Sequence, residues 1–128
     1  MTNDTISKSV NSDLEHLNNL IVDAIQDIKG KDILKIDLRQ IEESPADFFI
    51  ICSGDSNTQV SGIADNVIRK VKDTLGMKPG HKEGMAGSNW VLVDFFDTVV
   101  HVFYHETRRY YELEDLWSDG EITQYQNL

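Results

Sequence analysis

Residues 90–106, "WVLVDFFDTVVHVFYHE", decide the fold, because two runs of alternating apolar residues flank a short interruption. We place a two-residue turn at Phe95-Phe96, which pairs Trp90 with His101. Successive side chains of a strand point to opposite faces of the sheet. One face of this hairpin is mostly aliphatic and carries Val91, Val93, Thr98, Val100, Val102 and Tyr104. The other face carries Trp90, Leu92, Asp94, Asp97, Val99, His101 and Phe103.

The aliphatic face is expected to pack against helices, which leaves the second face for function. A mixture of aromatic, histidine and carboxylate side chains is typical of a catalytic floor or of a surface that binds another protein. The last third of the chain also concentrates aromatic residues, namely Trp90, Phe103, Tyr110, Tyr111 and Trp117. Such residues are enriched in protein interfaces, but they are also large core residues. We expect at least Trp117 or Tyr110 to be structural.

Upstream of the hairpin, the sequence predicts two helices and two strands. A capping box that begins at Ser12 predicts a helix over about 13–29, with Leu and Ile at helical spacing. Alternation predicts a strand at about 32–38, and a short apolar run predicts a buried strand at 48–52. A second capping box, from Ser56 to Gln59, opens a helix that ends at Gly76.

The remaining segments are a loop, a short helix and a tail. Glycine and proline predict a long loop over 77–89. Residues 107–117 predict a helix whose core-facing stripe is Tyr110, Leu113, Leu116 and Trp117. The order α-β-β-α-β-β-α, with a strand–helix–strand crossover, predicts a single α/β domain with a mixed sheet and helices mainly on one face. We place this domain at 12–117, between a flexible N-terminal segment, 1–11, and a flexible acidic tail, 118–128.

Composition restricts the class of partner. The chain has 128 residues and a net charge of −10, which argues against direct phosphate-driven binding of nucleic acid and favours attraction to a basic surface. One cysteine, Cys52, excludes an intramolecular disulfide and a multi-thiolate zinc site. Neither a signal peptide nor an apolar stretch long enough to cross a membrane is recognisable. We therefore expect a cytoplasmic protein without a membrane partner.

Candidate chemical sites each have a simpler structural interpretation. The loop Ser53–Ser56 could hold an anion at a helix N-terminus, but turns of this kind are common between a strand and a helix. Asp94 and Asp97 could hold a cation or divide acid and base roles, although hydrogen bonds to turn N–H groups are the preferred interpretation. Cys52 is expected to be a buried, unreactive thiol. No nucleophile, base and orienting group can be assembled, which argues against an enzyme.

The longer motifs resemble a known family. "DFFIICSGDSNTQVSGIADNV" and "EGMAGSNWVLVDFFDTVVHVFYHETRRYYELEDLW" are similar to the ribosomal silencing factor family, also called Iojap-like, and the similarity extends over roughly 13–117. The C-terminal signature W-x-x-x-D…V-V-H-V-F…R-x-Y-x-L-E-x-L-W maps onto this chain from Trp90 to Trp117.

The resemblance implies a non-enzymatic translation factor that needs no cofactor or metal. Members bind large-subunit ribosomal protein fourteen, block joining of the small subunit and silence translation when nutrients are short. The residues expected to contact that protein are Trp90, Leu92, Asp94, Val99, His101, Phe103, Arg109 and Tyr111. A homodimer in the free state is left open.

The resemblance also implies a nucleotidyltransferase-like topology, so a nucleotide-binding enzyme is the alternative function. Such enzymes need a Gly-Ser turn after a strand, whereas Ser53-Gly54 has the reverse order. One further departure concerns Phe96, which stands where the family usually has glycine. A tight hairpin turn favours positive φ, which is unfavourable for Phe, so the turn could be wider and the register different.

Overall fold

A computed structural model describes the backbone of residues 2–128 and the side chains of 12–128. Six strands form one sheet in the order β3-β4-β5-β2-β1-β6. The strands are β1 (Lys31–Asp37), β2 (Phe48–Gly54), β3 (His81–Glu83), β4 (Trp90–Asp94), β5 (Thr98–Tyr104) and β6 (Glu121–Tyr125). The helices are α1 (Thr2–Asp27), α2 (Asn57–Leu75), α3 (His105–Tyr111) and α4 (Leu113–Leu116).

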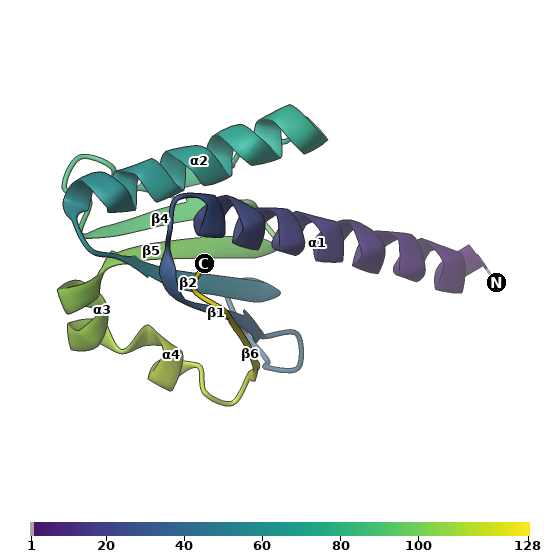
Figure 1. Cartoon of the computed structure of the whole chain (residues 1–128). Helices are drawn as coiled ribbons and strands as arrows, with labels where there is room; N and C mark the ends of the chain where they lie inside the picture. Colours follow the sequence, from purple (N-terminus) through teal and green to yellow (C-terminus); the bar gives the residue numbers. More distant parts are fainter. Residues whose placement is uncertain (1) are drawn as a thin grey trace.

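The sheet is mixed, as the sequence predicts. β2 and β5 are parallel and are joined by a crossover through α2, while the other paired strands are antiparallel. Figure 1 shows the long helices α1 and α2 on one side of the sheet and the short helices α3 and α4 on the other. The predicted α/β class and single domain are confirmed, and most of the helical mass covers one face.

The main core lies between the sheet and the two long helices. The four hairpin valines that we expected in the core are all 0% exposed. They pack with buried residues of α1 and α2, which include Ile21, Ile25, Ile63 and Val67. The alternation of the hairpin sequence therefore identifies the buried face correctly.

The ends of α2 follow the predicted capping chemistry. The Ser56 side chain accepts a hydrogen bond of 3.0 Å from the Gln59 backbone N–H. The Gln59 side chain reaches back and accepts from the Asp55 N–H at 2.6 Å. Gly76 has a φ of 66° and donates its N–H to the Lys72 carbonyl, as a left-handed C-terminal cap does. Both termini of α2 are therefore encoded locally.

The hairpin register differs from the prediction by two residues. Trp90 pairs with Phe103 rather than with His101, and Asp94 pairs with Val99 rather than with Asp97. The cause is Phe95, which is 2% exposed in the core and extends the hydrogen bonding of the hairpin beyond the end of β4, since its N–H donates to the Thr98 carbonyl at 2.9 Å. A shift of two leaves every side chain on its predicted face, because the side-chain period is two.

The hairpin turn is therefore formed by Phe96 and Asp97. Phe96 adopts a φ of 74°, in the region that favours glycine. The Asp94 carboxylate accepts a hydrogen bond of 2.7 Å from the Phe96 N–H, so the preferred interpretation of this carboxylate as a turn acceptor is confirmed. Placing the turn at Phe95-Phe96 is wrong, because burial of the Phe95 ring outweighs the unfavourable backbone of its neighbour.

The two ends of the chain are more structured than predicted. α1 begins at Thr2, so the helix start at Ser12 is wrong and the capping box there lies within the helix. At the other end, the expected flexible tail 118–128 contains β6, which pairs with β1 from Ile33↔Tyr125 to Asp37↔Glu121. The unpaired edge of β1 offers backbone donors and acceptors to this segment, a driving force that the tail sequence alone does not show.

Two internal predictions also need correction. The loop 77–89 contains a short strand, β3, which pairs with β4 at the other edge of the sheet. The predicted helix 107–117 is interrupted at Glu112, which has φ 48° and ψ 47° and separates α3 from α4. The stripe that assumed one continuous helix is consequently wrong for Tyr110, which is 83% exposed, and for Leu116, which is 74% exposed, whereas Leu113 is buried as predicted.

Truncation of a core valine tests the assignment of the aliphatic face. Val102→Ala removes two methyl groups from a fully buried site, and by analogy with other aliphatic truncations it should lower the free energy of unfolding by roughly 1–3 kcal/mol. Urea denaturation followed by circular dichroism gives this value. Thr58→Ala, at an exposed position of α2, is the control and should change stability by less than about 0.5 kcal/mol. Equal effects of the two substitutions would contradict the assignment.

Candidate interaction surface

The second face of the sheet is largely buried by a smaller core. This core consists of Ile36, Leu38, Ala46, Phe49, Ile51, Val99, Phe103 and Leu113. Three of the residues expected to contact a partner are buried in this smaller core. Val99 is 7% exposed, His101 4% and Phe103 0%. The expectation that these three residues contact a partner directly is therefore wrong, because α4 and the loop between β1 and β2 supply side chains that cover this part of the face.

His101 is the most polar member of this buried layer. Its Nδ1 accepts a hydrogen bond of 3.1 Å from the Trp90 indole N–H, which places the proton of the neutral ring on Nε2. Nε2 itself is buried and has no hydrogen-bond partner within the described part of the chain. Burial lowers the pKa of His101 to about 4. The ring is thus neutral near pH 7 and orients Trp90.

Trp90 connects the buried layer to the surface. Its ring stacks on Phe103 with centroids 4.8 Å apart and an interplanar angle of 26°. Tyr111 lies 4.9 Å from the Trp90 centroid, and Tyr110 lies 5.2 Å from Tyr111 in an edge-on arrangement. Tyr111 is 53% exposed, so a ladder of aromatic rings leads from the core to solvent. We call Trp90, Tyr110 and Tyr111 the aromatic surface.

The other predicted site residues surround this ladder to different degrees. Leu92 is partly buried and packs against the smaller core. Asp94 is also partly buried, and its carboxylate already accepts the hydrogen bond from the Phe96 N–H in the hairpin turn. Arg109 is exposed on α3. Trp117, expected to be structural, does pack against the smaller core, and its ring meets Phe49 edge-on at 5.8 Å. The predicted residues thus divide into an exposed group and a supporting group.

Sequence reasoning missed the residue that positions α3. Arg108 is 8% exposed, and its Nη1 donates to the Asp32 carbonyl at 2.6 Å and to the Ser53 hydroxyl at 2.9 Å. Its Nε donates to Glu114 at 3.0 Å. One guanidinium group therefore ties α3 to β1, β2 and α4. The C-terminal signature contains both the arginines and Glu114, and an acidic residue this close in the chain is the sequence signal that could have suggested an ion pair.

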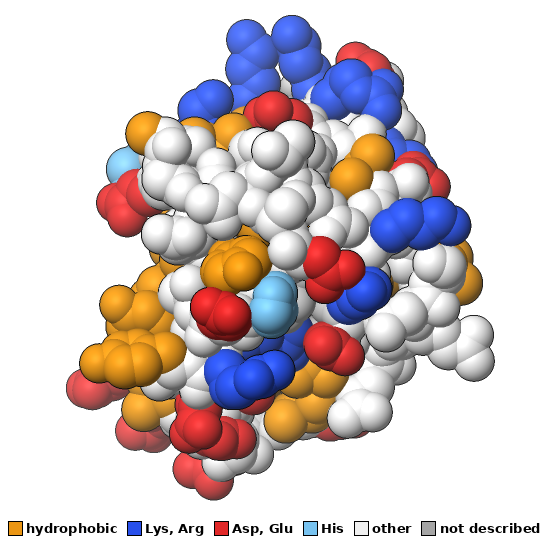
Figure 2. Space-filling model, turned by 60° about the vertical axis from the view of Figure 1, so that its left-hand side comes forward, with side chains coloured by type: hydrophobic (Ala, Val, Ile, Leu, Met, Phe, Trp, Pro, Cys, Tyr) orange, Lys and Arg blue, Asp and Glu red, His pale blue; other side chains and the backbone are white. Residues whose placement is uncertain are grey.

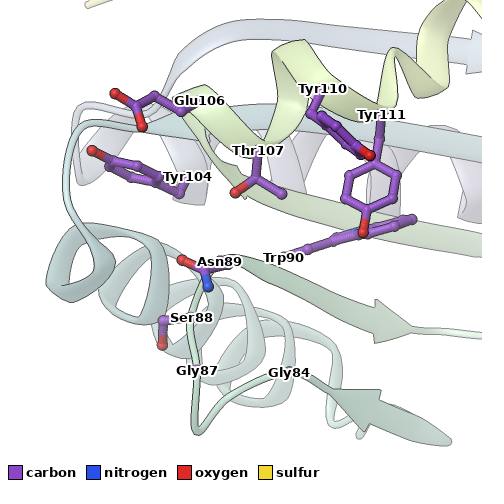
Figure 3. Close-up of a pocket in the computed structure, with 10 residues that line it drawn as sticks. All are labelled: Gly84, Gly87, Ser88, Asn89, Trp90, Tyr104, Glu106, Thr107, Tyr110 and Tyr111. Atoms are coloured by element: carbon purple, nitrogen blue, oxygen red, sulfur yellow. The ribbon is translucent and has the colours of Figure 1, made fainter.

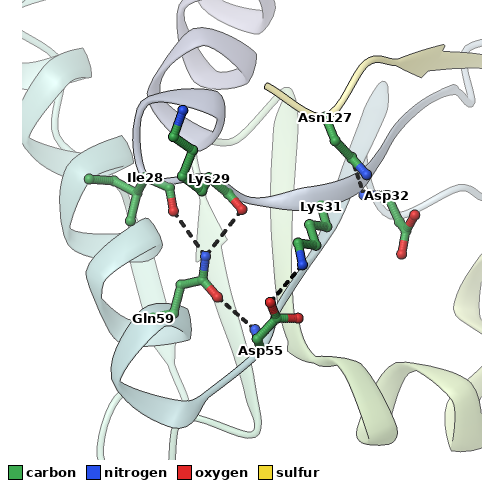
Figure 4. Close-up of polar contacts among 7 residues, drawn as sticks. All are labelled: Ile28, Lys29, Lys31, Asp32, Asp55, Gln59 and Asn127. Carbon is green, nitrogen blue, oxygen red and sulfur yellow. Dashed lines mark hydrogen bonds and ion pairs between the residues drawn. The ribbon is translucent and has the colours of Figure 1, made fainter.

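The loop Ser53–Ser56 has its polar groups occupied by the chain itself. The Ser53 hydroxyl accepts from Arg108, and the Asp55 N–H donates to Gln59. Figure 4 shows the Gln59 amide donating in turn to the carbonyls of Ile28 and Lys29, and Lys31 paired with Asp55 at 2.7 Å. These contacts use the donors that an anion would need, which favours the structural interpretation of this turn.

Beside the aromatic surface lies a groove between α3 and the turn that precedes β4. Its volume is about 660 Å³, and its lining is Gly84, Gly87, Ser88, Asn89, Trp90, Tyr104, Glu106, Thr107, Tyr110 and Tyr111. Figure 3 shows Tyr104 and Glu106 toward one end, Trp90 and Tyr111 toward the other, and Thr107 between them. Aromatic rings thus line both ends of a hollow that is open to solvent.

Exposed acidic residues outnumber the exposed Arg109 in the part of the chain that carries this surface and follows it. Exposed acidic residues follow α3 in the chain, namely Glu112, Asp115, Asp119 and Glu121. Figure 2 shows hydrophobic side chains gathered at the left of the view with acidic side chains below them, while Lys and Arg side chains gather at the top and also lie near the centre. A partner that docks on the aromatic surface therefore meets acidic side chains at its margin.

Reactive groups are scarce in the described residues. Cys52 is fully buried, and burial raises the pKa of its thiol to about 12, so the expected unreactive thiol is confirmed. Among residues 12–128, no group of three or more His, Cys, Asp or Glu side chains could hold a metal ion. None of the helices described is long and apolar enough to span a membrane.

A small α/β domain with an exposed aromatic surface defines a protein that acts by binding another macromolecule. Residues 11–128 match the family described as "Ribosomal silencing factor during starvation". Ribosomal silencing factor RsfS of Halalkalibacterium halodurans is 37% identical over 114 residues, which cover 89% of this chain and 96% of that protein. RsfS of Bacillus subtilis is 42% identical over 99 residues, with coverage of 77% and 82%.

Solved structures agree with this result. A crystal structure of a Chromobacterium violaceum protein is similar with a TM-score of 0.77 at 39% identity, over 81% of this chain and 85% of that one. The chain belongs to the ribosomal silencing factor family. Family membership gives it a ribosome-associated role in silencing translation, as a regulatory protein rather than an enzyme. The predicted family and the predicted absence of enzymatic activity are thereby confirmed.

Burial of His101 should make stability depend on pH. Its pKa is about 4 in the folded protein against 6.5 for the free side chain, so the unfolded state binds more protons between these values. Protonation of the unfolded state therefore lowers the free energy of unfolding as the pH falls from above 6.5 toward 4. The loss reaches about 3 kcal/mol at pH 4. His101→Gln keeps an acceptor for Trp90 but does not titrate.

The measurement is the free energy of unfolding of both proteins at pH 7 and at pH 4. We expect the wild type to lose about 3 kcal/mol more than His101→Gln over this interval. Identical losses would show that His101 is accessible to protons in the folded state.

Proposed function

We propose that this protein binds large-subunit ribosomal protein fourteen through the aromatic surface and thereby blocks joining of the small subunit. The observation that carries the proposal is the exposure of Tyr110 and Tyr111 on a rigid aromatic ladder that ends at Trp90. Tyr and Trp are the residues that most often contribute strongly to binding in protein interfaces. The partner itself follows from the family resemblance of the signature between Trp90 and Trp117.

The predicted contact residues take different parts in this proposal. Trp90, Tyr111, Arg109 and the partly buried Leu92 are accessible and form the contact. His101, Phe103 and Val99 lie beneath them and hold Trp90 in position. Asp94 supports the contact indirectly, because its carboxylate fixes the hairpin turn at the end of the strand that carries Trp90.

Silencing then follows from obstruction. A folded domain of 14.6 kDa that occupies the subunit-facing surface of the large subunit excludes the small subunit sterically. No chemical step is needed, and the affinity of the factor together with its concentration sets the degree of silencing. Because ribosomal subunits join in the cytoplasm, the proposed factor acts in that compartment.

Substitution of an exposed tyrosine tests the contact. Tyr111→Ala should weaken association with purified large subunits by more than about 1 kcal/mol, the usual threshold for an important interface residue. The thermal midpoint should change little, because the side chain is 53% exposed. Phe96→Ala is the matched control, since Phe96 is 69% exposed on the hairpin turn at the far end of β4.

Binding is measured by co-sedimentation with large subunits, and silencing by formation of joined ribosomes after small subunits are added. Analytical ultracentrifugation of the unbound factor decides whether it is a homodimer. Loss of binding by Phe96→Ala with full binding by Tyr111→Ala would place the contact elsewhere. Unchanged joining at saturating wild-type protein would contradict the proposed function itself.

Salt dependence tests the electrostatic part of the proposal. A net charge of −10 should steer the factor toward a basic ribosomal protein. The association rate should therefore fall as ionic strength rises through about 0.15 M, where the Debye length is about 8 Å. Stopped-flow or surface-based kinetics with isolated ribosomal protein fourteen gives this rate. An association rate that does not change with salt would leave the aromatic contact as the only determinant.

A further inference from the structure

The groove beside the aromatic surface has a composition that selects one kind of ligand. Of its ten lining residues, only Glu106 carries a charge, and four are aromatic: Trp90, Tyr104, Tyr110 and Tyr111. Aromatic ring faces attract cations, and a carboxylate near them adds direct charge attraction. The lining therefore favours a cationic, planar group over a neutral or an anionic one.

The wall opposite α3 is built without bulky side chains. Gly84 has a φ of 84°, and a Cβ at this position would collide with the Trp90 carbonyl. The turn is closed by the Ser88 N–H, which donates to the Gly84 carbonyl at 2.8 Å, and by the Ser88 hydroxyl, which donates to the Met85 carbonyl at 2.8 Å. This wall is thus formed before any ligand arrives, and it leaves room for a long side chain.

The wall formed by α3 is also held in place. Arg108 fixes the helix from its buried side, and the Tyr104 N–H donates to the Asn89 carbonyl at 2.8 Å where the two walls meet. Figure 3 shows Thr107 and Tyr111 directed from α3 toward the strand that carries Trp90. A preformed groove loses little conformational entropy on binding.

We infer that this groove receives an arginine side chain from a basic loop of the ribosomal protein partner, with the guanidinium between the tyrosine rings and Glu106. This inference rests on the proposed function and adds the chemistry of the partner segment. Arginine suits the site better than lysine, because its planar group stacks on aromatic rings while donating to a carboxylate. The acidic residues after α3 favour a basic segment in the same way.

RNA is the competing occupant, since bases also stack on aromatic side chains. Each nucleotide, however, brings a phosphate toward Glu106 and toward a chain of net charge −10. Of the residues that line the groove, none is basic. The observations therefore favour a cationic protein segment.

The probe is a capped pentapeptide, Gly-Gly-Arg-Gly-Gly, titrated into the full chain and followed by amide and indole nuclear magnetic resonance. We expect shifts in residues 84–89 and 104–111 and at the Trp90 indole. The Trp117 indole, which does not line the groove, is the internal reference. A peptide with citrulline in place of arginine keeps the shape but loses the charge, and should bind about two- to fivefold more weakly.

Glu106→Gln should weaken binding of the arginine peptide by a similar factor. Glu42→Gln, at an exposed position of the loop between β1 and β2, should leave its binding unchanged. Equal binding of the arginine and citrulline peptides, or shifts confined to other surfaces, would overturn the inference. Tighter binding of a hexauridine oligonucleotide at the same residues would assign the groove to RNA instead.

Co-sedimentation with large subunits separates this inference from the proposed function. If the wild type binds subunits and Glu106→Gln binds equally well, the groove is not part of the contact although the function stands. If the wild type does not bind subunits, the proposed function fails whatever the peptide does. The expected result is subunit binding by the wild type that Glu106→Gln weakens and Glu42→Gln does not.

Discussion

The buried guanidinium of Arg108 is the interaction on which the functional half of the molecule depends. A charged group that is 8% exposed must satisfy its donors inside the protein, because an unpaired buried charge is strongly unfavourable. Arg108 does so with a backbone carbonyl of β1, a hydroxyl of β2 and a carboxylate of α4. These three contacts place a helix of only seven residues against the sheet. That helix presents Tyr110 and Tyr111, two of the three residues of the aromatic surface.

The break at Glu112 completes this arrangement. A continuous helix would place Tyr110, Leu113 and Trp117 on one stripe, so that exposure of the tyrosine and burial of the leucine would conflict. The left-handed backbone at Glu112 changes the direction of the chain, so that Leu113 is buried while Tyr110 and Tyr111 face solvent. A left-handed residue other than glycine costs about 1 kcal/mol, which burial of one leucine offsets.

The two faces of the sheet therefore have different tasks. The valine face packs against α1 and α2 and holds most of the hydrophobic core. The second face holds a thinner layer in which His101 and Phe103 support Trp90 from below. Interface residues held by rigid neighbours lose little entropy on binding. A member of the ribosomal silencing factor family can in this way present a stable surface without an active site.

Local sequence patterns determined the parts of this protein whose physical cause is local. Alternation identified the valine face, the capping box at Ser56 identified the start of α2, and the long signature identified the family. Tertiary structure decided the rest. The register depended on burial of Phe95, and β6 required the free edge of β1. Arg108 and Arg109 are adjacent and chemically identical in the sequence, and only the acceptors that folding brings together make one of them a buried anchor and leave the other exposed.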